Sequence, residues 1–486
     1  MKIQKNSNIP KTPTGIHGLD EITGGGLPKG RPTLICGSAG CGKTLFAVQF
    51  LVKGITECNE PGVFMSFEET ARDLTENVNS LGFDLKKLIA DKQLKIDHIR
   101  IEKSEIEETG EYDLEGLFIR LNYAIDSIGA KRVVLDTIES VFGGMDNTIL
   151  LRSEIRRLFQ WLKDKGVTAI ITGERGESSL TRQGLEEYVS DCVILLDFRV
   201  IDQIATRRLR IVKYRGSMHG TNEYPFLIDE KGVSVLPITS LKLEHKTSGE
   251  MISYGFPALD KLFKGNGYYR GNSCLITGTA GTSKTILASY FALSSCKRKE
   301  STLYFSFEES PEQLLRNMLS VGIDLKPFLK SKLLQIHSSR PSMQGLEMHL
   351  LIIQRLIKEY DPKTVIIDPI SSLVTIGSSS EVRAMLLRLI DVLKINQINA
   401  LFTALTHDAK NEHNDLTVDA VSSLADTWIK VRNEEINGER VRSLFIVKSR
   451  GMGHTNALYN LSINEKGIGL TPPMNKPSRE KQEGLL

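Results

Sequence analysis

A glycine-rich segment, which reads GSAGCGKT at residues 37–44, places the strongest constraint on how this chain folds. An apolar run at residues 32–36 precedes it, and a helical pattern at residues 45–52 follows it. A strand that leads through a glycine loop into a helix forms a phosphate cradle, because successive backbone N–H groups and a helix N-terminus point at the anion. The segment therefore predicts a nucleotide site rather than a chance glycine-rich turn, which would lack these flanks.

The chain contains a second loop of the same kind. Residues 278–285 read GTAGTSKT and lie between an apolar run at residues 273–277 and a helical pattern at residues 286–293. In such loops the lysine reaches the β- and γ-phosphate oxygens and the next hydroxyl binds Mg²⁺, so we expect ATP at both loops, with Thr44 and Thr285 as magnesium ligands. The predicted nucleotide-binding residues of the two loops are Gly37, Ser38, Ala39, Gly40, Cys41, Gly42, Lys43 and Thr44, and Gly278, Thr279, Ala280, Gly281, Thr282, Ser283, Lys284 and Thr285.

Further pairs of matching segments show that the repeat extends well beyond the loops. With the loops included, the paired segments lie 232 to 241 positions apart and occur in the same order in both halves. Solenoid repeats are several times shorter, so this period indicates two tandem copies of a whole domain. The pairs are FMSFEE at 64–69 with YFSFEE at 304–309, RVVLD at 132–136 with TVIID at 364–368, and VKYRGSMH at 212–219 with VKSRGMGH at 447–454.

Each copy alternates apolar, strand-like runs with helical patterns. This alternation predicts an α/β fold, with a mostly parallel sheet flanked by helices in each domain. We place the N-terminal domain at residues 1–245, the C-terminal domain at residues 246–470 and a mobile, polar tail at residues 471–486. The clearest helical patterns cover residues 117–128, 149–163, 348–359 and 382–393.

The charge balance and the cysteine pattern exclude several classes of protein. The 62 basic and 59 acidic residues give a net charge of +3, which does not indicate a nucleic-acid partner. Six cysteines without a C-x-x-C pair indicate reduced thiols rather than disulfides or a metal site. Because no segment resembles a secretory signal or a membrane span, we expect a cytoplasmic protein without a membrane partner.

Acidic residues follow two strand-like runs of each copy. In parallel sheets ligands bind beyond the carboxyl ends of the strands, where the phosphate loops also lie. Asp136 and Asp368 are therefore expected on the magnesium side of each nucleotide, and a carboxylate of the paired acids is expected to orient the attacking water. These paired acids, which are otherwise common at strand ends, are the predicted catalytic residues Glu68, Glu69, Glu308 and Glu309.

A basic K-x-R-G-x-x-H element also occurs in both copies. On its own such an element is typical of a solvated edge strand, but its recurrence indicates a functional role. Alternation along a strand places the lysine and the arginine on one side, as a clamp for the charge of a transferring phosphoryl group requires. The predicted nucleotide-binding residues of this element are Lys213, Arg215 and His219, and Lys448, Arg450 and His454.

Together, the duplicated loop, the paired acids, the strand-end aspartate and the K-x-R-G-x-x-H element resemble the KaiC family of circadian clock ATPases. The resemblance covers nearly the whole chain. It implies two tandem RecA-like P-loop NTPase domains and a homohexamer with ATP at the subunit interfaces, so that the basic element acts on the neighbouring subunit's nucleotide. It also implies a C-terminal autokinase and phosphatase, with Ser422 and Ser423 as phosphorylation sites shortly before Asp426. Without the resemblance, the two serines would be an ordinary polar pair.

Three departures from the family pattern concern the second domain and the tail. Ser283 replaces the glycine before the loop lysine and could crowd the phosphate if that position needs a positive φ. Pro369 follows Asp368 in place of a small polar residue. The short tail argues against a KaiA-like partner, whereas a KaiB-like partner fits the N-terminal domain, with the acidic segment 102–111 as the candidate region or, alternatively, as a solvated loop.

The hypothesis that follows is a nucleotide- and phosphorylation-gated signalling or timing protein. It hydrolyses ATP in the N-terminal domain and phosphorylates its adjacent serines in the C-terminal domain. One alternative is a RecA- or DnaB-like DNA-dependent ATPase, for which we find no cluster of basic and aromatic loop residues. Another alternative is a nucleotide-gated scaffold without kinase activity.

Overall fold

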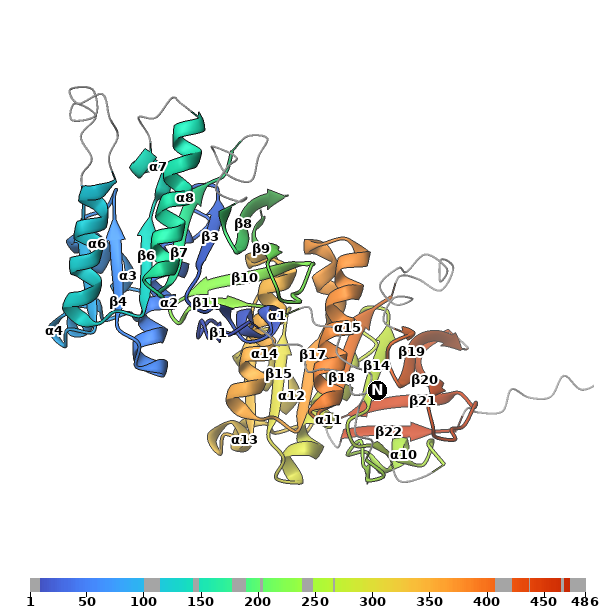
Figure 1. Cartoon of the computed structure of the whole chain (residues 1–486). Helices are drawn as coiled ribbons and strands as arrows, with labels where there is room; N and C mark the ends of the chain where they lie inside the picture. The colour runs from blue at the N-terminus through green and yellow to red at the C-terminus, as the bar shows by residue number, and fades with distance from the viewer. Residues whose placement is uncertain are drawn as a thin grey trace, which may run out of the picture. The chain divides into compact units, whose positions relative to one another are not determined.

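The chain folds into two compact units, Met1–Ser240 and Leu241–Leu486 (Figure 1). The computed structural model describes residues 9–99, 114–142, 148–176, 189–201, 204–237, 248–264, 267–406, 422–436, 438–464 and 467–472. The expected domain boundary at residue 245, the acidic segment 102–111 and residues 473–486 of the expected tail (residues 471–486) lie outside the described residues, whereas Thr471, the first residue of that tail, ends strand β22 (Gly467–Thr471).

Each unit is built on a nine-stranded sheet with the same strand order in both units. Six neighbouring strands are parallel, and three antiparallel strands extend the sheet on the side of β8 or β19. This architecture confirms the predicted α/β class of two tandem domains. In spatial order, the first sheet contains β11 (Gly232–Val235), β10 (Glu223–Asp229), β9 (Ile204–Tyr214), β8 (Cys192–Ile201), β3 (Pro32–Gly37), β7 (Thr168–Glu174), β6 (Arg132–Asp136), β4 (Gly62–Ser66) and β5 (Leu94–His98).

The second sheet repeats this order strand by strand. Its central strand, β14, is the counterpart of β3 and again leads into a phosphate loop. In spatial order, the sheet contains β22 (Gly467–Thr471), β21 (Tyr459–Asn464), β20 (Glu439–Ser449), β19 (Thr427–Ile436), β14 (Ser273–Gly278), β18 (Asn399–Leu405), β17 (Thr364–Asp368), β15 (Thr302–Ser306) and β16 (Leu334–Ser338). Two short antiparallel strand pairs form separate two-stranded sheets, β1 (Lys11–Thr12) with β2 (Leu27–Pro28) and β12 (Met251–Ile252) with β13 (Tyr268–Tyr269).

Helices cover both faces of each sheet, because the buried strands are apolar on both sides. In β3, for example, Leu34 packs in the cluster with the helices that contain Leu121 and Leu158, whereas Ile35 packs with Phe46 and Leu74. Within the described residues, the helices of the first unit are α1 (Leu19–Thr23), α2 (Lys43–Cys58), α3 (Ala71–Asn79), α4 (Leu85–Ala90), α6 (Glu115–Ile128), α7 (Ile138–Phe142) and α8 (Thr148–Asp164). Those of the second unit are α10 (Pro257–Asp260), α11 (Lys284–Lys297), α12 (Pro311–Leu319), α13 (Lys326–Lys330), α14 (Leu346–Tyr360) and α15 (Ser379–Ile395), with 3₁₀ turns η1 (Pro341–Met343) and η2 (Ile370–Ile376).

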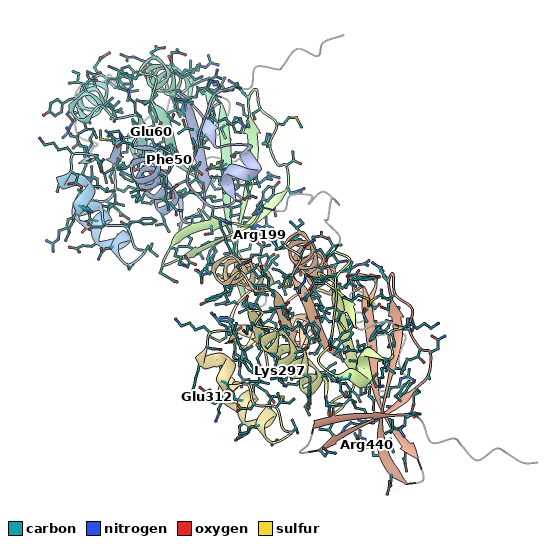
Figure 2. The ribbon with its side chains drawn as sticks, turned by 90° about the horizontal axis from the view of Figure 1, so that it is seen from below. Phe50, Glu60, Arg199, Lys297, Glu312 and Arg440 are labelled. Carbon is teal, nitrogen blue, oxygen red and sulfur yellow. The ribbon has the colours of Figure 1, made fainter. Side chains whose placement is uncertain are left out.

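A fully buried arginine anchors the start of β6 in the first unit. Arg132 is 0% exposed and donates from Nε to Glu60 Oε2 at 2.7 Å and from Nη1 to the carbonyl of Phe50 at 2.8 Å. Figure 2 labels both of these neighbours. A buried charge is tolerated only when it is paired, so these contacts hold in place the strand that ends at Asp136.

Candidate nucleotide site

Both phosphate loops lie where the central strand of a sheet passes into a helix, α2 in the first unit and α11 in the second. The Lys43 ammonium donates to the carbonyls of Gly37 and Ser38 at 2.9 and 3.2 Å. The Lys284 ammonium donates to Gly278 and Thr279 at 2.9 Å each. Each lysine therefore curls over its own loop, with the ammonium at the cradle. Burial lowers the pKa of Lys284, and the nearby charges of Asp368 and Glu308 oppose this shift.

The backbone of the loops requires left-handed conformations just before the lysine. Gly42 has a φ of 101°, and Ser283 at the same position has a φ of 70°. The Ser283 hydroxyl makes no capping hydrogen bond to helix α11. The sequence could not decide whether Ser283 has a positive φ, and the structure shows that it does. This left-handed backbone conformation is unfavourable for residues with a side chain.

The strand-end aspartates lie beside the loops, as the topology of a parallel sheet predicts. Asp136 accepts a hydrogen bond from the Thr172 hydroxyl, and the Thr44 hydroxyl and Lys43 also contribute to its environment. Burial raises the pKa of Asp136; these neighbours oppose the shift, and nearby Glu68 adds to it. In the second unit, the Thr403 hydroxyl donates to Asp368 in the same way.

Each acid pair is joined to the neighbouring strand end through the backbone. The N–H of Phe67 donates to the Asp136 carbonyl at 2.9 Å, and the N–H of Phe307 donates to the Asp368 carbonyl at 2.9 Å. The peptide bond after the aspartate is cis in both units, before Thr137 in the first and before Pro369 in the second. The paired acids, the aspartate and the loop therefore meet at one edge of each sheet.

The two acids of a pair occupy different environments, which the sequence does not distinguish. Glu68 accepts hydrogen bonds from the hydroxyls of Thr137 and Ser140 at 3.0 and 2.9 Å. In the second unit, Glu308 accepts one from Ser372 at 3.0 Å. The first acid of each pair thus faces the segment after the strand-end aspartate, where it can orient a nucleophile.

The second acid of each pair is held by the following helix instead. Glu69 accepts from the Asn77 amide at 3.4 Å, and Glu309 accepts from the Asn317 amide at 3.1 Å. Both asparagines lie on the helix that directly follows the pair, α3 or α12. This difference favours Glu68 and Glu308 over Glu69 and Glu309 as the residues that contact the reacting groups.

The basic element lies at the opposite edge of the sheet from the phosphate loop of its own unit. Lys213 pairs with Val193, which lies beside Leu34, three residues before the loop begins at Gly37. Arg215 follows the end of β9 and lies farther still from the loop. In the second unit, Lys448 pairs with Trp428, which lies beside Leu275. The basic element and the phosphate loop of one unit are therefore not brought together.

The two histidines of the element differ. The His219 ring stacks on Tyr214 with the ring centroids 6.3 Å apart, whereas His454 Nδ1 contacts the carbonyl of Thr455 at 3.1 Å. Burial and the adjacent charge of Arg450 lower the pKa of Lys448, and Asp426 opposes this shift. The basic side chains of this element therefore lie close together in the second unit.

Ser422 and Ser423 lie at this same edge, just before β19. Arg450 Nη2 donates to the carbonyl of Ser423 at 2.6 Å. Asp426 anchors the segment, because its carboxylate accepts from the Ser273 backbone N–H at 3.0 Å and from the Lys394 ammonium at 2.8 Å. The serine pair and the basic element of the second unit are thus adjacent.

The residues at the loop edge fit ATP with Mg²⁺. A Cβ atom at Gly40 or Gly281 would meet no described residue within 4 Å, so the described part of the chain leaves open space beside the loops. The adjoining donors are hydroxyl and carboxylate oxygens, such as those of Thr44 and Asp136, which are the ligands that a hard divalent cation prefers. Bound Mg²⁺ would neutralise charge that develops on the phosphate oxygens.

Several site residues were not predicted from the sequence. The signal for them was the repeat itself, since Thr172 corresponds to Thr403, Ser140 to Ser372 and Lys163 to Lys394. Lys163 contacts Asp191 at 2.6 Å, as Lys394 contacts Asp426. A polar residue at equivalent positions of both copies is thus an indicator of a shared site.

Fold and site together define a protein with two tandem RecA-like P-loop domains of the ATPase class. The model of the KaiC ATPase family matches residues 12–240 and 252–475. The chain belongs to the KaiC family, and ATP binding follows from this membership. Within the described residues, no helix is long and apolar enough to cross a membrane.

The chain is similar over nearly its full length to cyanobacterial clock proteins. It is 56% identical to the circadian clock protein KaiC2 of Synechocystis over 463 residues, which cover 95% of this chain and 82% of the relative. It is 38% identical to the circadian clock oscillator protein KaiC of Synechococcus elongatus, over 94% of this chain and 88% of the relative. The KaiC of Thermostichus vulcanus is also 38% identical, over 96% of this chain and 89% of the relative.

Proposed function

We propose that this protein hydrolyses ATP at the first site and phosphorylates its own Ser422 and Ser423 at the second site, in a homohexamer with ATP at the subunit interfaces. The phosphorylation state and the bound nucleotide would then set its affinity for partners, among them a KaiB-like protein. The observation that carries the proposal is the position of the serines. They lie beside Arg450, at the sheet edge remote from their own phosphate loop.

This geometry favours transfer between neighbouring copies. A serine hydroxyl oxygen attacks the γ-phosphorus of ATP held by the neighbour's loop, the new O–P bond forms, and the bond to the bridging oxygen breaks so that ADP leaves. Glu308 of the neighbouring copy that holds the ATP accepts the serine proton. Lys448 and Arg450 stabilise the charge on the phosphoryl oxygens. At the first site, water takes the place of serine, Glu68 orients it, and Lys213 and Arg215 supply the positive charge.

Two lysine variants test the division of labour. Lys43→Ala is expected to abolish most ATP hydrolysis, whereas Lys284→Ala is expected mainly to remove phosphate from Ser422 and Ser423. The measurements are phosphate release and phosphosite mapping by mass spectrometry after incubation with ATP and Mg²⁺. A Ser422→Ala, Ser423→Ala double variant, with hydrolysis intact, is the control for the phosphosite signal.

The results distinguish the proposal from the scaffold alternative. A wild-type chain without phosphate on either serine would disprove the kinase activity. If Glu68→Gln with Glu69→Gln blocked hydrolysis but left nucleotide-dependent partner binding unchanged, the scaffold would be the better description. DNA-stimulated hydrolysis that weakens with salt would instead favour the motor alternative.

A further inference from the structure

The two sites differ in a buried residue behind the strand-end aspartate. In the second unit the hydroxyl of Tyr304 donates to Asp368 Oδ2 at 2.8 Å, and Tyr304 is 0% exposed. The repeat places Phe64 at the equivalent position of the first unit, where it is 1% exposed. A phenylalanine has no hydroxyl, so Asp136 lacks this donor.

The environment of the tyrosine is also more polar than that of the phenylalanine. Ser289 on α11 adjoins the phenol of Tyr304. Its counterpart on α2 is Val48, which is 2% exposed and packs in the same apolar cluster as Phe64. A hydrogen-bond partner lowers the cost of burying the hydroxyl of a phenol, and here that partner is the carboxylate of the site.

Both carboxylate oxygens of Asp368 therefore accept hydrogen bonds from side chains in the interior of the domain. The Thr403 hydroxyl donates to Oδ1 and the Tyr304 hydroxyl donates to Oδ2. Two donors from two different strands, β18 and β15, fix the rotation of the carboxylate about its Cβ–Cγ bond. Hydrogen bonds of this kind orient a metal-ligating group and tune its affinity.

We propose that Tyr304 is a positioning residue that orients the Asp368 carboxylate toward the Mg²⁺ of the second site. This inference rests on the proposed function, and on the expectation from the sequence that Asp368 lies on the magnesium side of the second site. The second site thus holds Mg²⁺ with the help of a residue that the first site does not have. The two sites differ in their dependence on Mg²⁺, and the cause lies in the interior of the domain rather than in the loops.

The test measures Mg²⁺-dependent binding of a fluorescent, non-hydrolysable ATP analogue to the full chain. A Lys43→Ala background removes binding at the first site. Tyr304→Phe, which keeps the ring, is expected to raise the Mg²⁺ concentration for half-maximal binding by about tenfold. Binding in the presence of EDTA is expected to remain unchanged, because the hydroxyl acts only through the magnesium-side carboxylate.

Tyr268→Phe is the matched control. Tyr268 is another buried tyrosine of the second unit, 1% exposed, and it packs against Phe291 and Tyr254 rather than against Asp368. Its replacement is expected to leave the Mg²⁺ dependence unchanged. Thermal unfolding of both variants reports on any loss of stability. Ser289→Val provides a second variant, which changes the surroundings of Tyr304 but retains the Tyr304 hydroxyl.

Two results would overturn the inference. If Tyr304→Phe left the Mg²⁺ dependence unchanged, or weakened binding equally with Mg²⁺ and with EDTA, the tyrosine would serve packing alone while the proposed function would stand. If the Lys43→Ala chain bound the analogue equally well with Mg²⁺ and with EDTA, the magnesium role of Asp368 would fail and the role of Tyr304 would fail with it.

Discussion

Single residues set the two nucleotide sites apart. Ser283 holds a φ of 70° where Gly42 holds 101°, and among the described residues one hydroxyl donates to Glu308 whereas two donate to Glu68. A side chain in the left-handed region costs roughly 1–2 kcal/mol, so the second loop carries a local penalty that the first does not. The sites are thus chemically similar but energetically different.

Ser283→Gly is expected to relieve this penalty. The variant should raise the free energy of unfolding of the second domain by about 1 kcal/mol, which corresponds to a Tm increase of about 2–4 °C for a domain of this size. The measurement is differential scanning calorimetry of the full chain. In the matched variant Gly42→Ala, the added Cβ would sit on a backbone with a φ of 101°, which is unfavourable for residues with a side chain, so the first domain should lose stability. An unchanged or lower Tm for Ser283→Gly would contradict the argument.

The glycine loops, the acid pairs and the strand-end aspartates were predictable at the scale of residues because each lies in a local motif. The distinction between Glu68 and Glu69 was not predictable. It depends on Asn77, which lies eight positions further along the chain, and on Ser140, which lies on another strand connection. Tyr304 and Asp368 are likewise 64 residues apart, so only the register of β15 and β17 brings them together.

At the scale of elements, equivalent helices of the two units pack through different residues. Helix α14 buries His349, which is 3% exposed, where the repeat places Leu117 of α6. His349 Nε2 contacts the carbonyl of Pro341 at 3.0 Å, and the ring meets Phe307 edge to face. The strand order was inferred only as mostly parallel from the sequence, because pairing depends on contacts between distant segments.

The buried histidine predicts a pH dependence of stability. Burial lowers the pKa of His349 below its ordinary value of 6.5, and burial likewise lowers the pKa of His337 nearby. The unfolded chain therefore binds more protons than the folded chain below about pH 6.5, so stability falls as the pH falls. His349→Leu is expected to reduce this slope, as measured by urea unfolding at pH 7.5 and pH 5.5. His337 remains, so part of the slope should persist, whereas an unaltered slope would refute the assignment.

At the scale of the whole molecule, family membership and the sheet-edge geometry together lead to the proposed hexamer. The loop and the basic element of one unit lie at opposite edges of a single sheet. A sequence pattern could identify both groups but could not show this separation, because it follows from the antiparallel return of β9 along β8. The separation is what makes a partner subunit necessary in the proposed mechanism.

A mixing experiment tests this requirement. Chains with Lys43→Ala and chains with Arg215→Ala are each expected to lose most hydrolysis. A mixed assembly contains sites that combine an intact loop with an intact arginine from the neighbour, so mixing should restore a substantial fraction of the activity. Phosphate release is measured at several mixing ratios, with each variant mixed with itself as the control. Activity that never exceeds the average of the two separate variants would argue for sites complete within one chain.

The placement of loop and cations on opposite sheet edges also links activity to the amount of protein present. Under the proposed arrangement a lone chain holds two half-sites in each domain and no whole one, so dilution lowers turnover per chain without altering any residue. Synthesis and degradation of the chain would then act on its rate through mass action, in addition to any control by partners. Under this arrangement, the ATP turnover per chain would depend on the concentration of the protein in the cell.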